Sequence, residues 1–145
     1  MTIARLVRKA TAEDIADVMA LRLSVHENRL SDPGQVTDAD CLRYVERGHI
    51  WVWEEDQEIL GFSASSCDTG WIWALFVRPG HEGRGIGRAL FATACGALIG
   101  AGCRTLQLST DPDTRAARFY SAAGWREAGR TPEGELVFKF NAPPA

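Results

Sequence analysis

The sequence predicts one α+β domain built on a mixed sheet. Three observations carry this prediction. Two stretches with helical periodicity come early, residues 49–77 alternate as a meander of strands, and the remainder alternates strand, helix, strand, helix and strand. The length of 145 residues fits a single domain, and 46% apolar residues suffice for a buried core without disulfides or metal. The domain is expected over 1–140, followed by a disordered, proline-containing tail over 141–145.

A strand and a helix open the chain. Ile3–Lys9 has the composition of a short strand. Thr11 stands three residues before Asp14, which is a variant of the capping box at a helix start. This helix is expected to end near His26–Asn28, because turn-forming residues follow.

A second helix is predicted next. Thr37, with an acidic residue three positions later, repeats the capping signal. Leu42 and Val45 are expected to face inward, and Gly48 to end the helix.

The period then changes from helical to alternating. His49–Glu54 and Glu58–Ser66 are predicted to pair as a hairpin, with Asp56 and Gln57 at the turn. Gly70–Val77 is apolar on both sides, so this third strand is expected to lie at the centre of the sheet.

The second half alternates strands and helices. A helix is predicted from about Arg84 to Gly100, a strand over Arg104–Thr110 and a helix from Asp111 to Ala123. Two closing strands are expected around a turn at Gly134, over the ranges Trp125–Glu127 and Glu135–Phe140.

Charge is divided unequally along the chain. Residues 1–70 carry 7 basic and 13 acidic side chains, whereas residues 71–145 carry 9 and 6, and the net charge is −3. Overall acidity argues against nucleic acid as the main partner. The division suggests an anionic ligand for the second half and a cationic one for the first, although ordinary solvated faces would give the same counts.

Nothing in the sequence indicates a membrane or an oxidising compartment. No stretch approaches the ~20 apolar residues of a membrane span, and the first nine residues are too charged for a secretory signal. The four cysteines form no CxxC pair, so no zinc site or redox motif is predicted. We therefore expect a cytoplasmic protein with reduced, mostly buried cysteines.

The stretch 77–90 carries the clearest chemical signal. It leaves the apolar central strand, turns at Pro79 and enters a helix through Gly83, Gly85 and Gly87. Glycines let the backbone approach a ligand, and amides at a helix N-terminus favour anions. Arg84 and Arg88 add positive charge at the same end. Together these features predict a phosphate or pyrophosphate site.

Three better-known motifs do not fit this stretch. Ile86-Gly87 stands where a Walker loop needs Lys-Ser/Thr. The Rossmann fingerprint fails because its last glycine would fall on Arg88 or Leu90. His81-Glu82 opens no zincin motif, since Gly85 takes the place of the second histidine.

The segment Glu82-Gly83-Arg84-Gly85-Ile86-Gly87 resembles the acyl-CoA-binding signature Gln/Arg-x-x-Gly-x-Gly/Ala of the GNAT superfamily of N-acetyltransferases. Residues 113–125, with Phe119-Tyr120 and Gly124, resemble a second block of that family, Asn-x-x-Ala-x-x-Phe-Tyr-x-x-x-Gly-Phe. The resemblance implies a three-layer α+β fold, in which a mixed, mostly antiparallel sheet of six to seven strands is flanked by about four helices. Glu82, Asp113 and Trp125 depart from the family pattern.

The resemblance also implies a site for acetyl-CoA. The backbones of Phe76 and Val77 would bind the pantetheine arm as an added strand, with a nearby amide polarising the thioester carbonyl. Tyr120 would protonate the departing thiolate as general acid. The pyrophosphate would be held by the signature, namely Gly83, Arg84, Gly85, Ile86, Gly87 and Arg88.

The general base is harder to assign. Family members often use a carboxylate on the central strand, but Gly70–Val77 contains none. The candidates are Glu27, at the end of the first helix, and Glu54, with His26 as an equal alternative. A solvated helix end explains Glu27 as well.

Four tryptophans form the last candidate feature. They alternate on two strands that we expect to be neighbours, as an aromatic wall for an amine acceptor or as core and dimer-interface packing. They are Trp51, Trp53, Trp71 and Trp73.

The resemblance implies an N-acetyltransferase that moves an acetyl group from acetyl-CoA to a primary amine by direct transfer in a ternary complex. The acceptor is a small molecule or a protein amino group. The sequence does not decide between a monomer and a homodimer. Two alternatives remain: a non-catalytic acyl-CoA-binding sensor or interaction module, and an NAD(P)-binding domain that tolerates the failed glycine spacing.

Overall fold

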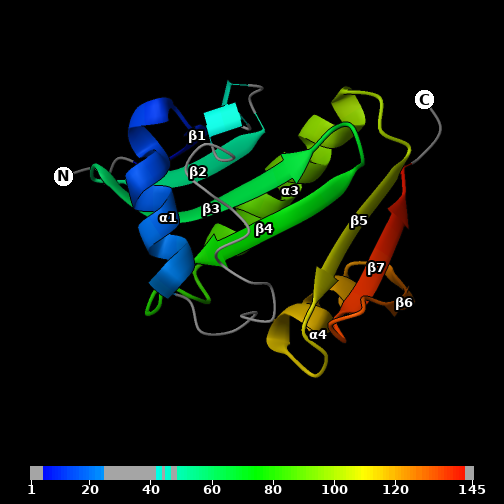
Figure 1. The fold of residues 1–145 in the computed structure, drawn as a ribbon. Helices are drawn as coiled ribbons and strands as arrows, with labels where there is room; N and C mark the ends of the chain where they lie inside the picture. Colours follow the sequence, from blue (N-terminus) through cyan, green and yellow to red (C-terminus); the bar gives the residue numbers. More distant parts are fainter. Residues whose placement is uncertain (1–4, 25–41, 44, 47–48, 143–145) are drawn as a thin grey trace.

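The computed structural model describes residues 5–24, 42–43, 45–46 and 49–142, and in them seven strands form one sheet in the order β1-β2-β3-β4-β5-β7-β6 (Figure 1). Neighbouring strands are antiparallel except for β4 and β5, which are parallel. The predicted mixed, mostly antiparallel sheet is therefore confirmed, with β4 at its centre. The strands are β1 (Arg5–Lys9), β2 (Ile50–Glu55), β3 (Glu58–Ser66), β4 (Trp71–Val77), β5 (Thr105–Thr110), β6 (Arg126–Arg130) and β7 (Leu136–Asn141).

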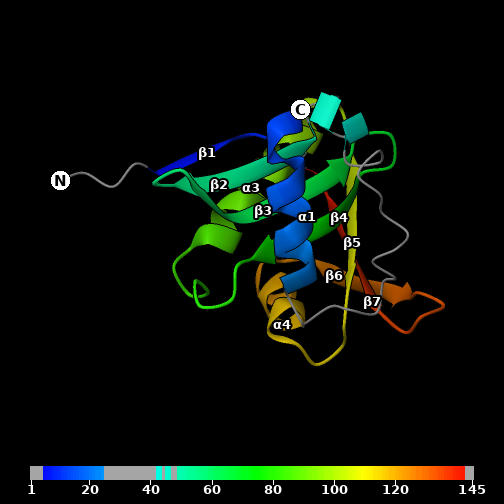
Figure 2. The ribbon, with the colours of Figure 1, turned by 60° about the vertical axis from the view of Figure 1, so that its left-hand side comes forward.

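Helices cover both faces of this sheet. The short 3-10 helix η1 (Ala12–Asp14) and α1 (Ile15–Ser24) lie on one face, and α3 (Ile86–Gly100) lies on the other (Figures 1 and 2). The helix α4 (Arg115–Ala122) packs on the same side as α3, because both contribute to one hydrophobic cluster with β5 and β7. None of the helices in the described ranges is long and apolar enough to span a membrane.

The first helix begins as the sequence predicts. Thr11 and Asp14 form the capping box, and the chain makes one 3-10 turn before α1. Its apolar side chains Val18 and Leu21 are buried against Val52 and Phe62 of the sheet. The predicted end of this helix lies outside the described residues.

Only part of the second predicted helix is described. Residues 42, 43, 45 and 46 are helical, whereas the predicted capping residues Thr37 and Asp40 and the terminating Gly48 lie outside the described ranges. Val45 packs against the core on the α1 side, as expected. The prediction for Leu42 was wrong, since its side chain is 36% exposed.

Close packing of α3 on the opposite face depends on a glycine. A Cβ at Gly61 of β3 would lie 2.9 Å from Leu90 Cδ1 and 3.0 Å from Ile86 Cγ2. Both α3 side chains are fully buried there, in a cluster with Leu60. The helix therefore rests on bare backbone, which brings its N-terminus close to the end of β4.

A bulge in β4 changes which way its residues face. Ala74 pairs with Ala64 and Ile72 with Ser65, so Trp73 is an extra residue in the strand. Trp73 and Ala74 consequently pack on the same side, against the α1-side core, and Leu75 returns to the α3 side. The strand is apolar on both faces, as predicted.

The sheet divides between β4 and β5. The two strands pair at one position, Trp71 with Gln107, and the Gln107 amide donates to the Gly70 carbonyl at 2.9 Å. Beyond this point they diverge, and α4 lies beside the C-terminal end of β5 (Figure 1). The edge of β4 that faces β5 is thus paired near its beginning and leaves β5 toward its end.

The chain ends the sheet one residue later than predicted. Asn141 still belongs to β7, and the Ala142 amide donates to the Arg104 carbonyl at 2.8 Å. Residues 143–145 of the predicted tail lie outside the described residues.

Candidate active site

The end of β4 presents backbone amides toward the side from which β5 has diverged. Arg78 N donates to Leu60 O at 2.8 Å, which fixes the alternation of the β3–β4 ladder. By that alternation Phe76 bonds to Phe62 of β3, and the backbones of Leu75 and Val77 point the other way. Of the predicted pair, Val77 therefore offers its backbone on the open side, whereas the backbone of Phe76 is directed at β3. Leu75 takes the place expected for Phe76, and only the bulge at Trp73 produces this register.

The glycine-rich loop joins β4 to α3 through turns in the left-handed region, which glycine adopts without strain. Gly83 and Gly85 have φ of +79° and +87°, in the left-handed region. A Cβ at either position would meet no atom within 4 Å, so the backbone there lies open to a ligand. The helix begins at Ile86, two residues later than predicted, with Gly85 as its N-cap. The first amides of α3 therefore point out beside an open backbone, which suits an anion.

Glu82, the main departure from the family signature, turns back onto the loop. Its carboxylate accepts a hydrogen bond from the Gly80 amide at 2.7 Å. The pKa of Glu82 is lowered by its own backbone amide and then by that of Gly80. The negative charge is thus bound by the loop itself.

Arg84, predicted to bind phosphate, is engaged elsewhere. Its Nη2 lies 2.9 and 2.8 Å from the two carboxylate oxygens of Glu55, the last residue of β2. Its Nη1 lies 2.9 Å from Nδ1 of His81. Arg88, at the third position of α3, is exposed.

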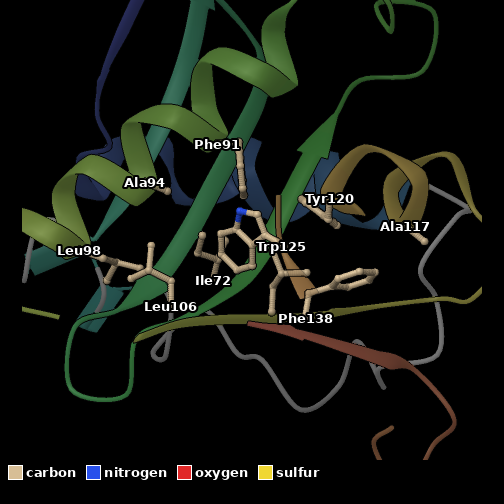
Figure 3. Packing of buried hydrophobic residues seen from close by; sticks show 10 residues of the cluster. Ile72, Phe91, Ala94, Leu98, Leu106, Ala117, Tyr120, Trp125 and Phe138 are labelled. Atoms are coloured by element: carbon tan, nitrogen blue, oxygen red, sulfur yellow. The ribbon is translucent and has the colours of Figure 1, made fainter. Parts of the chain in front are cut away.

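Tyr120 lies in the aromatic core under α4. It is 6% exposed, and its ring contacts Phe91, Trp125 and Phe138, all labelled in Figure 3, at centroid distances of 5.3–6.2 Å. The ring of Phe119 lies 5.4 Å from it. Burial raises the pKa of Tyr120 well above its usual value, with a smaller contribution from Cys95. The hydroxyl therefore stays protonated across the neutral range, as a general acid requires. Leu75 packs against the same cluster, which links Tyr120 to the open edge of β4.

Of the candidate bases predicted from the sequence, only Glu54 lies within the described residues. Glu27 and His26 lie outside the described residues. Glu54 accepts hydrogen bonds from Arg8, at 3.2 and 3.4 Å, so it is part of an ion pair on the outer strands of the sheet.

Two carboxylates that the sequence analysis did not propose as bases lie at the C-terminal end of β5. Asp111 directly follows the strand and is half-buried. Glu135 is buried directly before the neighbouring strand β7 and accepts a hydrogen bond from the Ser109 hydroxyl at 3.5 Å. Their positions beside predicted strand ends could have identified both residues in the sequence. Only the divergence of β4 from β5, which the sequence does not show, makes them candidates for a base.

The four tryptophans do not form one wall. The strands that carry them, β2 and β4, are not neighbours, since β3 lies between them. Trp51 and Trp53 pack with Leu60 on the α3 side, whereas Trp73 packs against the α1-side core. Packing on two opposite faces therefore accounts for three of the four rings.

Comparison with known proteins decides the family. The family model described as Acetyltransferase (GNAT) family matches residues 15–125. The chain belongs to the GNAT acetyltransferase family. The resemblance noted from the glycine-rich turn and the Phe119-Tyr120 block is thereby confirmed.

One curated protein is similar to this chain in sequence, and solved structures are similar to it in fold. The peptidyl-lysine N-acetyltransferase YiaC of Escherichia coli (strain K12) is 41% identical over 56 residues, which cover 35% of this chain and 38% of that relative's length. YncA of Salmonella typhimurium, solved with its cofactor acetyl-CoA, shares the fold with a TM-score of 0.77 at 17% identity, covering 98% of each chain. The PaiA N-acetyltransferase of Thermoplasma acidophilum, solved with coenzyme A, has a TM-score of 0.74 at 15% identity, covering 98% of this chain and all of its own.

Proposed function

We propose that this GNAT protein transfers the acetyl group of acetyl-CoA to a primary amine, on a small molecule or on a protein, within a ternary complex. The observation that carries the proposal is that an open strand edge, which can bind an amide-containing chain, continues directly into a loop that can bind an anion. The open backbones of Leu75 and Val77 at the end of β4 lead directly into the glycine loop at the N-terminus of α3.

The residues present fit an acyl-CoA donor. The backbones of Leu75 and Val77 offer the hydrogen bonds that an added strand would take, which suits the amide-containing pantetheine arm. The open loop over Gly83–Gly85 and the first amides of α3 suit the pyrophosphate, with Arg88 adding charge. Structures of YncA with acetyl-CoA and of PaiA with coenzyme A support this choice of donor.

Each step of the transfer then has a group on this chain. When bound, acetyl-CoA supplies an activated thioester. A backbone amide near Val77 on this open edge would donate to the carbonyl oxygen, where negative charge develops during attack. Tyr120 would donate its proton to the departing thiolate.

An alkylamine with a pKa of ~10 is mostly protonated at neutral pH, so a base must take up a proton before attack. Glu27 remains the prediction from the sequence, and the structure adds Asp111 and Glu135 at the end of β5 as candidates. The name of the relative YiaC, a peptidyl-lysine N-acetyltransferase, favours a lysine amino group as acceptor.

We keep the cytoplasm as the proposed location, since Cys67, Cys95 and Cys103 are free thiols. A homodimer, and the absence of nucleic-acid and membrane partners, stay predictions.

Calorimetric titration with acetyl-CoA, with free CoA and NADH in parallel, tests the donor. We expect micromolar binding of acetyl-CoA and none of NADH. An amine panel that includes lysine peptides, read by thiol release, then separates the transferase from a non-catalytic acyl-CoA-binding module. Binding without turnover on any amine favours the module, and folded protein that binds no CoA species refutes both.

A further inference from the structure

The ion pair between Glu55 and Arg84 connects the end of β2 to the glycine loop. One guanidinium nitrogen, Nη2, is shared by both carboxylate oxygens at 2.9 and 2.8 Å, and Nη1 reaches the His81 ring at 2.9 Å. Glu55 is only 8% exposed, whereas the Arg84 side chain is 38% exposed. The partners are 29 residues apart in the sequence, so the contact joins two separate parts of the fold.

The buried member of the pair makes the contact costly to break. A carboxylate as enclosed as that of Glu55 keeps its desolvation cost when a cationic partner is removed and loses the attraction that offset it, so removing Arg84 is expected to be destabilising. Hydrogen bonds between two ionised groups are also shorter and stronger than neutral ones. The guanidinium is therefore held at Glu55 rather than free to follow a ligand.

The loop needs such a support. Arg84 stands between Gly83 and Gly85, both at positive φ, and a Cβ added at either glycine would have no atom within 4 Å to pack against. Glycine backbones are the most costly to order. An anchored side chain between two such glycines restricts both of them at once.

We propose that Glu55 and Arg84 are positioning residues for donor binding: their ion pair fixes the glycine loop in its phosphate-binding shape, and Arg84 does not itself contact the phosphate. Glu55 neutralises the charge of Arg84, so the loop amides and Arg88 carry the attraction for the pyrophosphate. The inference rests on the proposed function and deepens it.

A double-mutant cycle tests the proposal. The variants are Glu55→Gln, Arg84→Gln and the double variant, each checked for folding by circular dichroism. We expect both single variants to raise the KM for acetyl-CoA by about tenfold with kcat changed less than about twofold, and the double variant to be no worse than either single one. S-acetylpantetheine, which lacks the pyrophosphate, should be used equally well by all four proteins.

The chain provides a matched control. Arg78 and Glu58 form a second ion pair between the same loop region and the β2–β3 hairpin, and both side chains are exposed. Glu58→Gln is expected to leave the KM for acetyl-CoA unchanged, since exposed pairs contribute little.

Direct phosphate binding by Arg84 gives the opposite pattern. Glu55→Gln would then free the guanidinium and lower or preserve the KM, while Arg84→Gln alone would raise it, and this outcome overturns the proposal. Equal losses with acetyl-CoA and S-acetylpantetheine overturn it as well, because they indicate general damage.

A failure of the proposed function is distinguishable from a failure of this inference. Amide hydrogen exchange at His81 and Ala89, whose amides donate to Arg78 O and Gly85 O at 3.0 Å each, is measured in the free protein without acetyl-CoA, and Glu55→Gln should speed it by at least about tenfold over wild type. Unchanged exchange rejects the ion pair as the support of the loop, whether or not acetyl-CoA binds.

Discussion

Nη1 of Arg8 lies 2.8 Å from Oδ2 of Asp14, and a second hydrogen bond of 3.1 Å joins Nη2 to Oδ1. The pair ties β1 to the start of the first helix. Oδ2 of Asp14 also accepts from the Thr11 amide at 2.7 Å, so one carboxylate serves both as cap and as ion-pair partner. The hydrogen bonds from Arg8 are the largest cause of the lowered pKa of Asp14.

Asp14 should make stability depend on acid pH. Its pKa in the folded state is below the unfolded value of about 3.9, so its contribution is complete above that value and is lost as the pH falls through the folded pKa. Asp14→Asn should cost about 1 kcal/mol at neutral pH and flatten the acid limb. Urea unfolding between about pH 7 and pH 3 measures this. Asp17→Asn, at an exposed site, is the control, and an unchanged acid limb in Asp14→Asn would contradict the assignment.

Tyr120→Phe keeps the ring and removes the proposed acid. Turnover should fall at least roughly tenfold, with little change in acetyl-CoA affinity. Since the ring packing is preserved, the unfolding free energy should change by less than about 1.5 kcal/mol. Steady-state kinetics and calorimetry on the same preparation separate the two effects. Wild-type turnover would remove Tyr120 from the mechanism.

Gly87→Asp should weaken acetyl-CoA binding by at least roughly tenfold, because it places a negative charge among the first amides of α3. Its Cβ would lie 3.4 Å from Val77 Cγ2, an ordinary contact, so folding should be retained. Gly85→Asp should bind as poorly, but its φ of +87° adds strain. Gly96→Asp, in the middle of the same helix, is the matched control and should bind normally. Equal affinity in Gly87→Asp and wild type would refute this position for the pyrophosphate.

Cys95 should be the slowest of the described thiols to react. Burial raises its pKa to about 12, so almost no thiolate is present at neutral pH. With iodoacetamide at about pH 8, Cys95 should be modified at least roughly a hundredfold more slowly than Cys67, as followed by peptide mass spectrometry. The difference should vanish in urea. Similar rates in the native protein would show that the Cys95 site opens readily.

The order of strands and helices was predictable because it depends on local patterns. Alternation located β2 and β3, and Asp56-Gln57 was identified as the turn, where both residues adopt positive φ. The glycine loop was found for the same reason, since its composition is local.

Long-range pairing was not predictable. Nothing near Arg84 in the sequence reveals that Glu55, 29 residues earlier, takes its guanidinium. The direction of the Leu75 and Val77 amides could not be predicted either, because it depends on Trp73, a residue of β4 that has no partner on β3. Leu42 has the spacing of an inward-facing helical residue. Its exposure depends on which other segment packs against the helix, and local sequence does not show this.

The extra residue at Trp73 makes the pairing of β4 matter as much as its composition. In a strand of the same length paired with β3 without this bulge, the backbone of Phe76 would face the open side and the Val77 amide would turn toward β3. Two homologues with equally hydrophobic central strands can therefore differ in which residues of that strand turn their backbones to the free edge. An alignment that omits a gap opposite Trp73 would match residues from opposite faces of the sheet, and functional residues transferred through it would be displaced by one position.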